Sequence, residues 1–189
     1  IQVMKKLFLF NILACLFALQ GLALEVGQTF TYKDENGTWK CSTNNSAHYT
    51  VTIISASDYG KEVVIPGVVN DGENEYEVTQ LGRELFCNSI ISKVTLPKSL
   101  RSLGAKAFYG CSDLQSVDLS FCCWIGKSAF FQCPKLRASL GWLCPILGSD
   151  AFDTTATLIA PFSGAASYRY SPDWFYDDSL LGASFRNWK

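Results

Sequence analysis

The chain has 189 residues, a net charge of −1 and a charged fraction of only 17%. This near-neutral balance excludes the basic footprint that nucleic-acid binding requires. The aromatic fraction of 14% excludes a largely disordered chain, and the length allows one or two domains with a hydrophobic core.

Residues 1–23 are typical of an export signal. Two lysines precede an apolar run over residues 7–24, and the small residues Gly21 and Ala23 favour cleavage after Ala23. Two alternatives remain open: a retained membrane anchor, and a lipoprotein signal that ends at Cys15. The segment therefore predicts export from a bacterium, with the protein either secreted or associated with the cell surface or outer membrane.

Residues 24–80 carry no repeat and are predicted to form a β-rich N-terminal cap. Short stretches rich in β-branched and aromatic residues indicate strands, and they cover residues 30–32, 49–54, 62–65 and 76–80. A solenoid needs such an end piece to cover the open face of its first unit.

Residues 81–161 repeat one pattern at a fixed period. The segments LGRELF, LGAKAF, IGKSAF and LGSDAF begin at residues 81, 103, 125 and 147. The constant spacing of these starts lies within the leucine-rich-repeat range of about 20–29 residues. Since one unit can bury its apolar side chains only against the next unit, the pattern predicts a short right-handed solenoid of about four rungs.

Each rung is expected to contain two parts, which makes the predicted fold class an α/β solenoid. The LGxxAF part indicates a short helical or 3₁₀ turn on the convex side. Its glycine suits a positive φ or a close backbone approach. Its phenylalanine is predicted to join a buried stack of Phe86, Phe108, Phe130 and Phe152.

The second part of each rung alternates apolar and polar residues, which predicts one strand of a parallel sheet. The inward side chains are expected to be Val94, Leu96, Val117 and Leu119. In the third rung, Arg137 and Ser139 face outward only if the register slips by one residue. The predicted outward face, which is the candidate partner-binding site, contains Lys93, Thr95, Ser116, Asp118 and Arg137.

Residues 162–189 form an aromatic-rich tail. We interpret it as a C-terminal cap over the last rung, and an exposed aromatic binding patch is the alternative.

Eight cysteines raise the question of disulfide bonds, which export permits. However, Cys111 and Cys133 occupy the same repeat position, and a periodic cysteine is typical of a small buried apolar side chain. Buried thiols are therefore the favoured interpretation at these two positions.

No residue pattern predicts catalysis. A histidine-based triad would depend on His48, the only histidine, and no Gly-x-Ser-x-Gly motif is present. The repeat glycines are single and periodic, unlike a phosphate-binding loop, and one histidine without a Cys-x-x-Cys pair makes a zinc site unexpected. We expect no catalytic residue, no cofactor, no metal ion and no enzymatic activity.

The segments LGAKAFYGCSDLQSVDL and IGKSAFFQCPKL resemble the BspA-type leucine-rich repeat family of bacterial surface proteins. Leu85 and Ser89 depart from the family pattern at its Ala and Cys positions. The resemblance implies a secreted or cell-surface module, without enzymatic activity, that binds a host matrix protein or a bacterial surface protein in adhesion. A structural spacer within an envelope assembly is the alternative. No nucleic-acid partner is expected, membrane attachment would come only from the signal or a lipid anchor, and the oligomeric state is not predicted.

The expected sheet face is small. Four rungs spaced by about 4.8 Å give a face of about 260 Å², whereas a standard interface covers about 800 Å² per partner. Either the caps and loops therefore contribute to binding, or binding is weak and multivalent.

Overall fold

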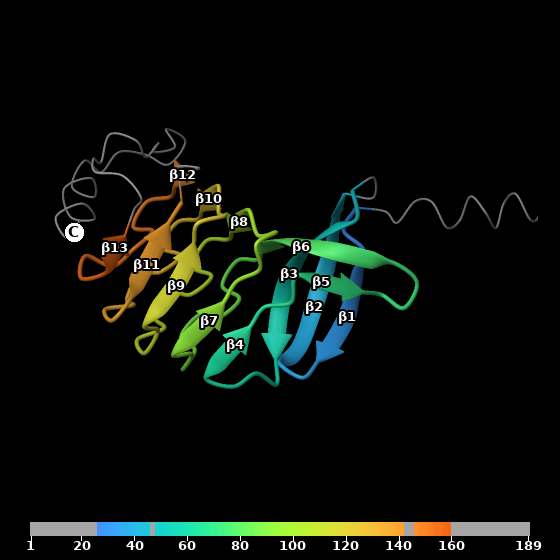
Figure 1. Ribbon diagram of the computed structural model, residues 1–189, viewed down its shortest axis with the longest axis horizontal. Helices are drawn as coiled ribbons and strands as arrows, with labels where there is room; N and C mark the ends of the chain where they lie inside the picture. Colours follow the sequence, from blue (N-terminus) through green and yellow to red (C-terminus); the bar gives the residue numbers. More distant parts are fainter. Residues whose placement is uncertain (1–25, 46–47, 142–145, 160–189) are drawn as a thin grey trace, which may run out of the picture.

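The computed structural model describes residues 26–45, 48–141 and 146–159, which form thirteen strands and no helix. The predicted export signal and the predicted C-terminal cap lie outside these ranges. In the described part of the chain, no helix is long and apolar enough to span a membrane. The strands form one eight-stranded and one five-stranded sheet, and they follow one another along the long axis of the molecule (Figure 1).

The N-terminal part is a β-meander. Strands β1 (Thr29–Asp34), β2 (Gly37–Asn45) and β3 (Thr50–Ser57) pair antiparallel in sequence order. Strand β6 (Glu75–Leu81) then pairs parallel with β3, and the short β5 (Val68–Asn70) pairs antiparallel with β6. The meander therefore continues into the repeat region without a break in the sheet.

Two aspartates fix the turns in this part of the chain. The carboxylate of Asp34 accepts hydrogen bonds from the backbone N–H of Gly37 at 3.0 Å and from the indole N–H of the buried Trp39, also at 3.0 Å. The carboxylate of Asp71 accepts the hydroxyl hydrogen of the buried Tyr76 at 2.7 Å. Short polar side chains stabilise turns in this way because they hydrogen-bond backbone groups a few residues further on.

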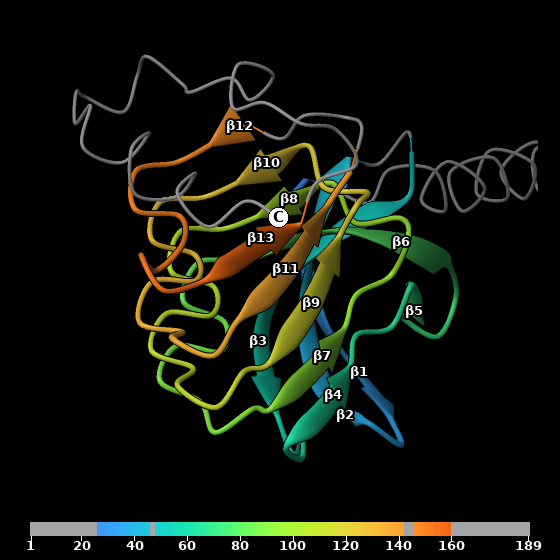
Figure 2. The same ribbon diagram turned by 60° about the vertical axis from the view of Figure 1, so that its left-hand side comes forward.

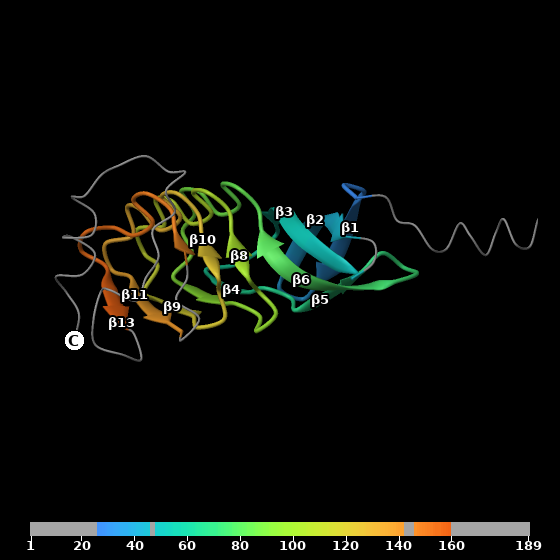
Figure 3. The same cartoon turned by 90° about the horizontal axis from the view of Figure 1, so that it is seen from above.

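The repeat region is a coil in which each rung adds a short parallel strand to each sheet (Figures 2 and 3). Strands β8 (Ser102–Leu103), β10 (Trp124–Ile125) and β12 (Ile146–Leu147) extend the eight-stranded sheet beyond β6. The five-stranded sheet contains β4 (Glu62–Val64), β7 (Lys93–Thr95), β9 (Ser116–Leu119), β11 (Arg137–Leu140) and β13 (Thr157–Ile159). The described core lies between the two sheets and the turns that connect them.

The five-stranded sheet begins earlier than the repeat pattern indicates. Strand β4 pairs in register with β7, so that Val63 lies opposite Val94, and Ile65 continues the pairing through a 2.9 Å hydrogen bond to the carbonyl of Thr95. This strand falls within residues 24–80, the segment that the sequence pattern assigned to the N-terminal cap. The strand predicted over residues 62–65 is therefore present, but its place in the repeat sheet was not predicted because the β5–β6 hairpin separates β4 from β7.

The expected helical turn in LGxxAF is wrong. Each of these segments contains a residue with a left-handed backbone, namely Glu84, Lys106, Ser128 and Asp150, with φ between 52° and 58°. A left-handed residue ends a right-handed helical path. The backbone instead pairs with the following rung: the N–H of Phe108 donates to the carbonyl of Ala129 at 2.8 Å, and the N–H of Phe130 donates to that of Ala151 at 2.7 Å.

The repeat glycines are required by close backbone approach, and positive φ falls two residues later. A Cβ added to Gly126 would lie 2.6 Å from the backbone nitrogen of Ala105, and one added to Gly104 would lie 2.6 Å from that of Arg83. Real Cβ atoms do not approach backbone atoms so closely. Of the two expected reasons for these glycines, the structure therefore supports the second.

The predicted phenylalanine stack is confirmed. Ring centroids are 5.1 Å apart between Phe86 and Phe108, 5.1 Å between Phe108 and Phe130, and 5.4 Å between Phe130 and Phe152. The four rings are at most 2% exposed, and Tyr59 closes the N-terminal end with an edge contact to Phe86 at 5.2 Å. Aromatic rings bury large apolar areas, so the stack is the central element of the repeat core.

The prediction of buried thiols at Cys111 and Cys133 is also confirmed. Burial raises the pKa of Cys111 to about 11 and that of Cys133 to about 12. The six cysteines in the described ranges are all free thiols.

Candidate protein-binding face

The outer face of the five-stranded sheet carries two rows of side chains, because successive residues of a strand point to opposite faces. The inward positions are apolar, with Val94, Val117, Ala138 and Leu158 all buried. The strand pairing places the first outward row as Glu62, Lys93, Ser116, Arg137 and Thr157. The second row lies two residues further along each strand and contains Val64, Thr95, Asp118, Ser139 and Ile159.

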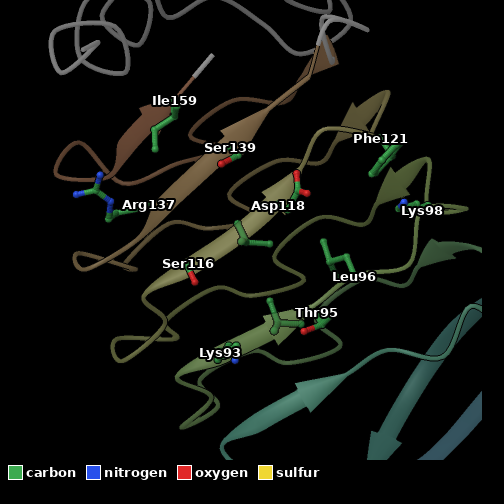
Figure 4. Close-up of a pocket in the computed structure, with 12 residues that line it drawn as sticks. Lys93, Thr95, Leu96, Lys98, Ser116, Asp118, Phe121, Arg137, Ser139 and Ile159 are labelled. Atoms are coloured by element: carbon green, nitrogen blue, oxygen red, sulfur yellow. The ribbon is translucent and has the colours of Figure 1, made fainter. Parts of the chain in front are cut away.

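An open groove of about 500 Å³ lies over this face (Figure 4). Strands β7, β9, β11 and β13 provide most of its lining. The lining residues are Lys93, Val94, Thr95, Leu96, Lys98, Ser116, Val117, Asp118, Phe121, Arg137, Ser139 and Ile159. The structure therefore brings together all five residues of the predicted partner-binding face.

The slip in register that the third rung requires is present. Arg137 pairs with Ser116 and Ser139 with Asp118, so the step between these two strands is one residue shorter than the repeat period. Ala138 then takes the inward position opposite Val117. The shift explains why the sequence of this rung shows no Val-x-Leu alternation at the expected positions.

Leu96 does not point fully inward as expected. It is only partly buried and lines the groove. Three more lining residues were not predicted: Lys98 and Phe121 lie beyond the ends of their strands, where the period-two pattern stops, and Ile159 lies on the outward face of β13. The outward alternation of the fourth rung is the signal that could have identified Ile159.

The charged groups of the groove differ in the hydrogen bonds and ion pairs that they already make. Lys93 Nζ lies 3.6 Å from Glu62 Oε2 in an exposed ion pair. Asp118 Oδ1 accepts a hydrogen bond from the backbone N–H of Ser120 at 2.9 Å, and Lys98 Nζ lies 5.9 Å above the ring of Phe121. Within the described ranges, Arg137 has no side-chain hydrogen bond or ion pair.

The groove does not contain the residues that the sequence offered for chemistry. His48 is exposed in the turn between β2 and β3 and does not line the groove. Over residues 26–45, 48–141 and 146–159, no group of three or more His, Cys, Asp or Glu side chains could hold a metal ion. The arrangement suits contact with a partner through charged, hydroxyl and apolar side chains.

Residues 72–159 match the family model described as "BspA type Leucine rich repeat region", in six copies. This segment therefore belongs to the BspA-type leucine-rich repeat family, as its sequence motifs suggested. Comparison with curated protein sequences gives no match. Membership of this family is consistent with a protein-binding module, and the family is typically non-enzymatic.

Two crystal structures share the fold. A leucine-rich repeat protein from Bacteroides capillosus is 24% identical with a TM-score of 0.53, and the match covers 68% of this chain and 97% of that protein. A leucine-rich repeat protein from Bacteroides ovatus is 23% identical with a TM-score of 0.56, and the match covers 75% of this chain and 40% of that protein. At this identity the likeness shows the solenoid fold alone.

Proposed function

We propose that this chain is an exported bacterial module, without enzymatic activity, that binds a partner protein through the outer face of the five-stranded sheet. The observation that carries the proposal is the groove itself. It gathers exposed side chains from four rungs on a backbone that is hydrogen-bonded from rung to rung. Sites built on regular elements hold their side chains in fixed relative positions, which favours recognition.

The family supports the class of function, and the chemistry of the groove supports its location. The groove combines cationic, hydroxyl and apolar groups, the mixture found in protein interfaces. Lys98 and Phe121 widen the face beyond the strands, although it stays below the roughly 800 Å² per partner of a standard interface. We therefore propose weak binding that several copies or neighbouring loops strengthen, in adhesion to a host matrix or another bacterial surface.

We also propose a division of the chain. Residues 1–23 direct export, residues 24–80 form an N-terminal cap that covers the first rung, residues 81–161 form the repeats, and residues 162–189 cover the last rung. Contacts at the N-terminal end support the second part: Tyr59 closes the phenylalanine stack, and Phe30 lies 5.2 Å from Tyr76 between ring centroids. Export would be tested by sequencing the N-terminus of the protein recovered from the cell envelope and the medium.

Binding is tested with the purified chain immobilised on a surface and screened against extracellular-matrix proteins and bacterial envelope proteins. The charge-reversed variants Lys93→Glu and Asp118→Lys are screened beside it, with Lys127→Glu as a control, since Lys127 is exposed but does not line the groove. We expect a partner whose binding changes in the first two variants, in opposite directions if the partner segment is charged, and persists in the control. Binding that all three variants retain would move the site away from the sheet, and the complete lack of a partner would favour the structural spacer.

A further inference from the structure

The groove is cationic on a chain that is slightly acidic. Its lining contains Lys93, Lys98 and Arg137 against the single carboxylate of Asp118, whereas the chain as a whole has a net charge of −1. Glu62, the ion-pair partner of Lys93, lies on the same face beside the groove, so the face as a whole carries three cations and two carboxylates. Charge complementarity between partners determines both the preference for a partner and the rate of association.

The four charges of the groove are not equally available to a partner. The ammonium of Lys93 is already paired with Glu62, and the carboxylate of Asp118 already accepts the N–H of Ser120. The ammonium of Lys98 has only the ring contact with Phe121 at 5.9 Å. The exposed guanidinium of Arg137 has no side-chain hydrogen bond or ion pair among the described residues. Guanidinium groups bind carboxylates through two parallel hydrogen bonds, which adds geometric preference to the charge attraction.

Apolar groups flank these charges on the same face. Leu96 and Phe121 lie on the side of the groove away from Arg137, and Ile159 lies at its β13 end (Figure 4). Ile159 is 39% exposed. A partner that satisfied only the cations, such as an anionic polysaccharide, would leave these side chains in water. A peptide segment with both carboxylates and aliphatic side chains satisfies both kinds of group.

We infer that the groove binds an acidic, aliphatic peptide segment of the partner protein, with Arg137 as the residue that receives its carboxylate. This inference rests on the proposed function and adds the chemistry of the partner. Because Arg137 is exposed, its attraction for the carboxylate is screened by salt over about 10 Å at 0.1 M ionic strength. Binding is therefore expected to weaken as salt is added.

The test uses the full chain labelled with ¹⁵N and three short blocked peptides that alternate leucine with glutamate, glutamine or lysine. Amide chemical shifts locate each peptide and give its dissociation constant. We expect the glutamate peptide to shift amides of β7, β9 and β11 and to bind at least about tenfold more tightly than the lysine peptide. Arg137→Gln should weaken it by about threefold to tenfold, and Lys127→Gln should leave it unchanged.

Three results would overturn the inference: equal or tighter binding of the lysine peptide, unchanged binding by Arg137→Gln, or tighter binding of heparin than of the glutamate peptide at the same amides. If the screen yields a partner protein that shifts the groove amides and the glutamate peptide does not compete with it, this inference fails and the proposed function stands. If neither the peptides nor any screened protein shifts a groove amide, both fail.

Discussion

The thiol of Cys133 donates a hydrogen bond to the backbone carbonyl of Phe108 in the preceding rung, at a sulfur-to-oxygen distance of 3.1 Å. The thiol of Cys111 makes the same bond to the carbonyl of Phe86, also at 3.1 Å. These two thiols thus connect the second and third rungs to the backbone at the phenylalanine position of the rung before. A thiol in this position has a structural role, and because it is buried it should react more slowly than the thiol of an exposed cysteine.

Alkylation of the native protein should therefore be selective. Cys123 is exposed, whereas Cys111, Cys122 and Cys133 are buried, and only an accessible thiolate reacts with iodoacetamide. At pH 8 we expect labelling of Cys123 within minutes and protection of these three thiols, and of the buried Cys41, until the chain unfolds. Mass spectrometry of the digested protein reads this pattern, with urea-unfolded protein as the control. Rapid labelling of Cys133 in the native state would contradict the buried column.

Alkaline pH should destabilise the reduced protein. Burial raises the pKa of Cys41, Cys122 and Cys133 from 9.0 to about 12, and that of Cys111 to about 11. The folded state thus holds these protons more tightly than the unfolded state, so its stabilisation is complete below pH 9 and declines from pH 9 to about 12.

Urea unfolding between pH 8 and 11, in the presence of a reductant, measures this decline. Cys122→Ala removes one of the buried thiols and should reduce the slope of unfolding free energy against pH. An equal slope in Cys122→Ala and the parent protein would show that the buried thiols do not control the alkaline limit.

Truncation of the central ring should be costly. Phe130→Ala would open a cavity between Phe108 and Phe152 and should lower the free energy of unfolding by about 3–5 kcal/mol. Phe130→Leu retains most of the volume and should cost less. Phe131, which is only partly buried and stacks 6.0 Å from Tyr109, provides the neighbouring control, since Phe131→Ala should cost well under half as much. Comparable losses at the two positions would mean that the stack is not the main source of stability.

A single methyl group on a repeat glycine should also destabilise the fold. Gly126→Ala would place a Cβ 2.6 Å from the Ala105 nitrogen, against backbone of the previous rung that cannot move independently. Overpacking of this kind costs about 1–3 kcal/mol or more. The nearest atom to a Cβ on Gly60 lies 4.0 Å away, so Gly60→Ala should be tolerated. Thermal melting compares the two variants directly, and similar melting temperatures would argue against the close approach.

The core of the repeat could be predicted from the sequence because it depends on residues that recur at one period. Phe86, Phe108 and Phe130 recur at that period, and so do the glycines that let the rungs approach. The geometry of the turn could not be predicted in the same way. An Ala-Phe pair four residues after an aliphatic residue suits a helix, and only the left-handed backbone of residues such as Lys106 and Ser128 prevents one. Neither lysine nor serine is a residue type that indicates a positive φ.

The groove residues within strands could be predicted from the alternation of apolar and polar side chains, whereas those beyond the strand ends could not. Lys93, Thr95, Ser116 and Asp118 follow from the period-two pattern, whereas Lys98 and Phe121 reach the face from segments without a regular period. The place of strand β4 in the five-stranded sheet was missed for another reason. Its Glu62 pairs with Lys93, which lies further along the chain than one repeat period, and a search at a fixed spacing does not find a rung enlarged by a hairpin.

The two sheets keep different spacing, and this has a consequence for how the binding face can change. In the eight-stranded sheet, the successive partners Gln80, Ser102, Trp124 and Ile146 are evenly spaced along the chain. In the other sheet, the step from Lys93 to its partner Ser116 is one residue longer than that spacing, and the step from Ser116 to Arg137 is one residue shorter. The segment before β9 is one residue longer than the repeat period requires and the segment after it is one residue shorter. The total length of the two turns is therefore unchanged, and only the position of the strand along the chain differs. A one-residue insertion before an outer strand, paired with a one-residue deletion after it, can therefore change which side chains face outward while the phenylalanine stack stays intact. Laboratory evolution could use such paired changes to alter partner preference at little cost in stability.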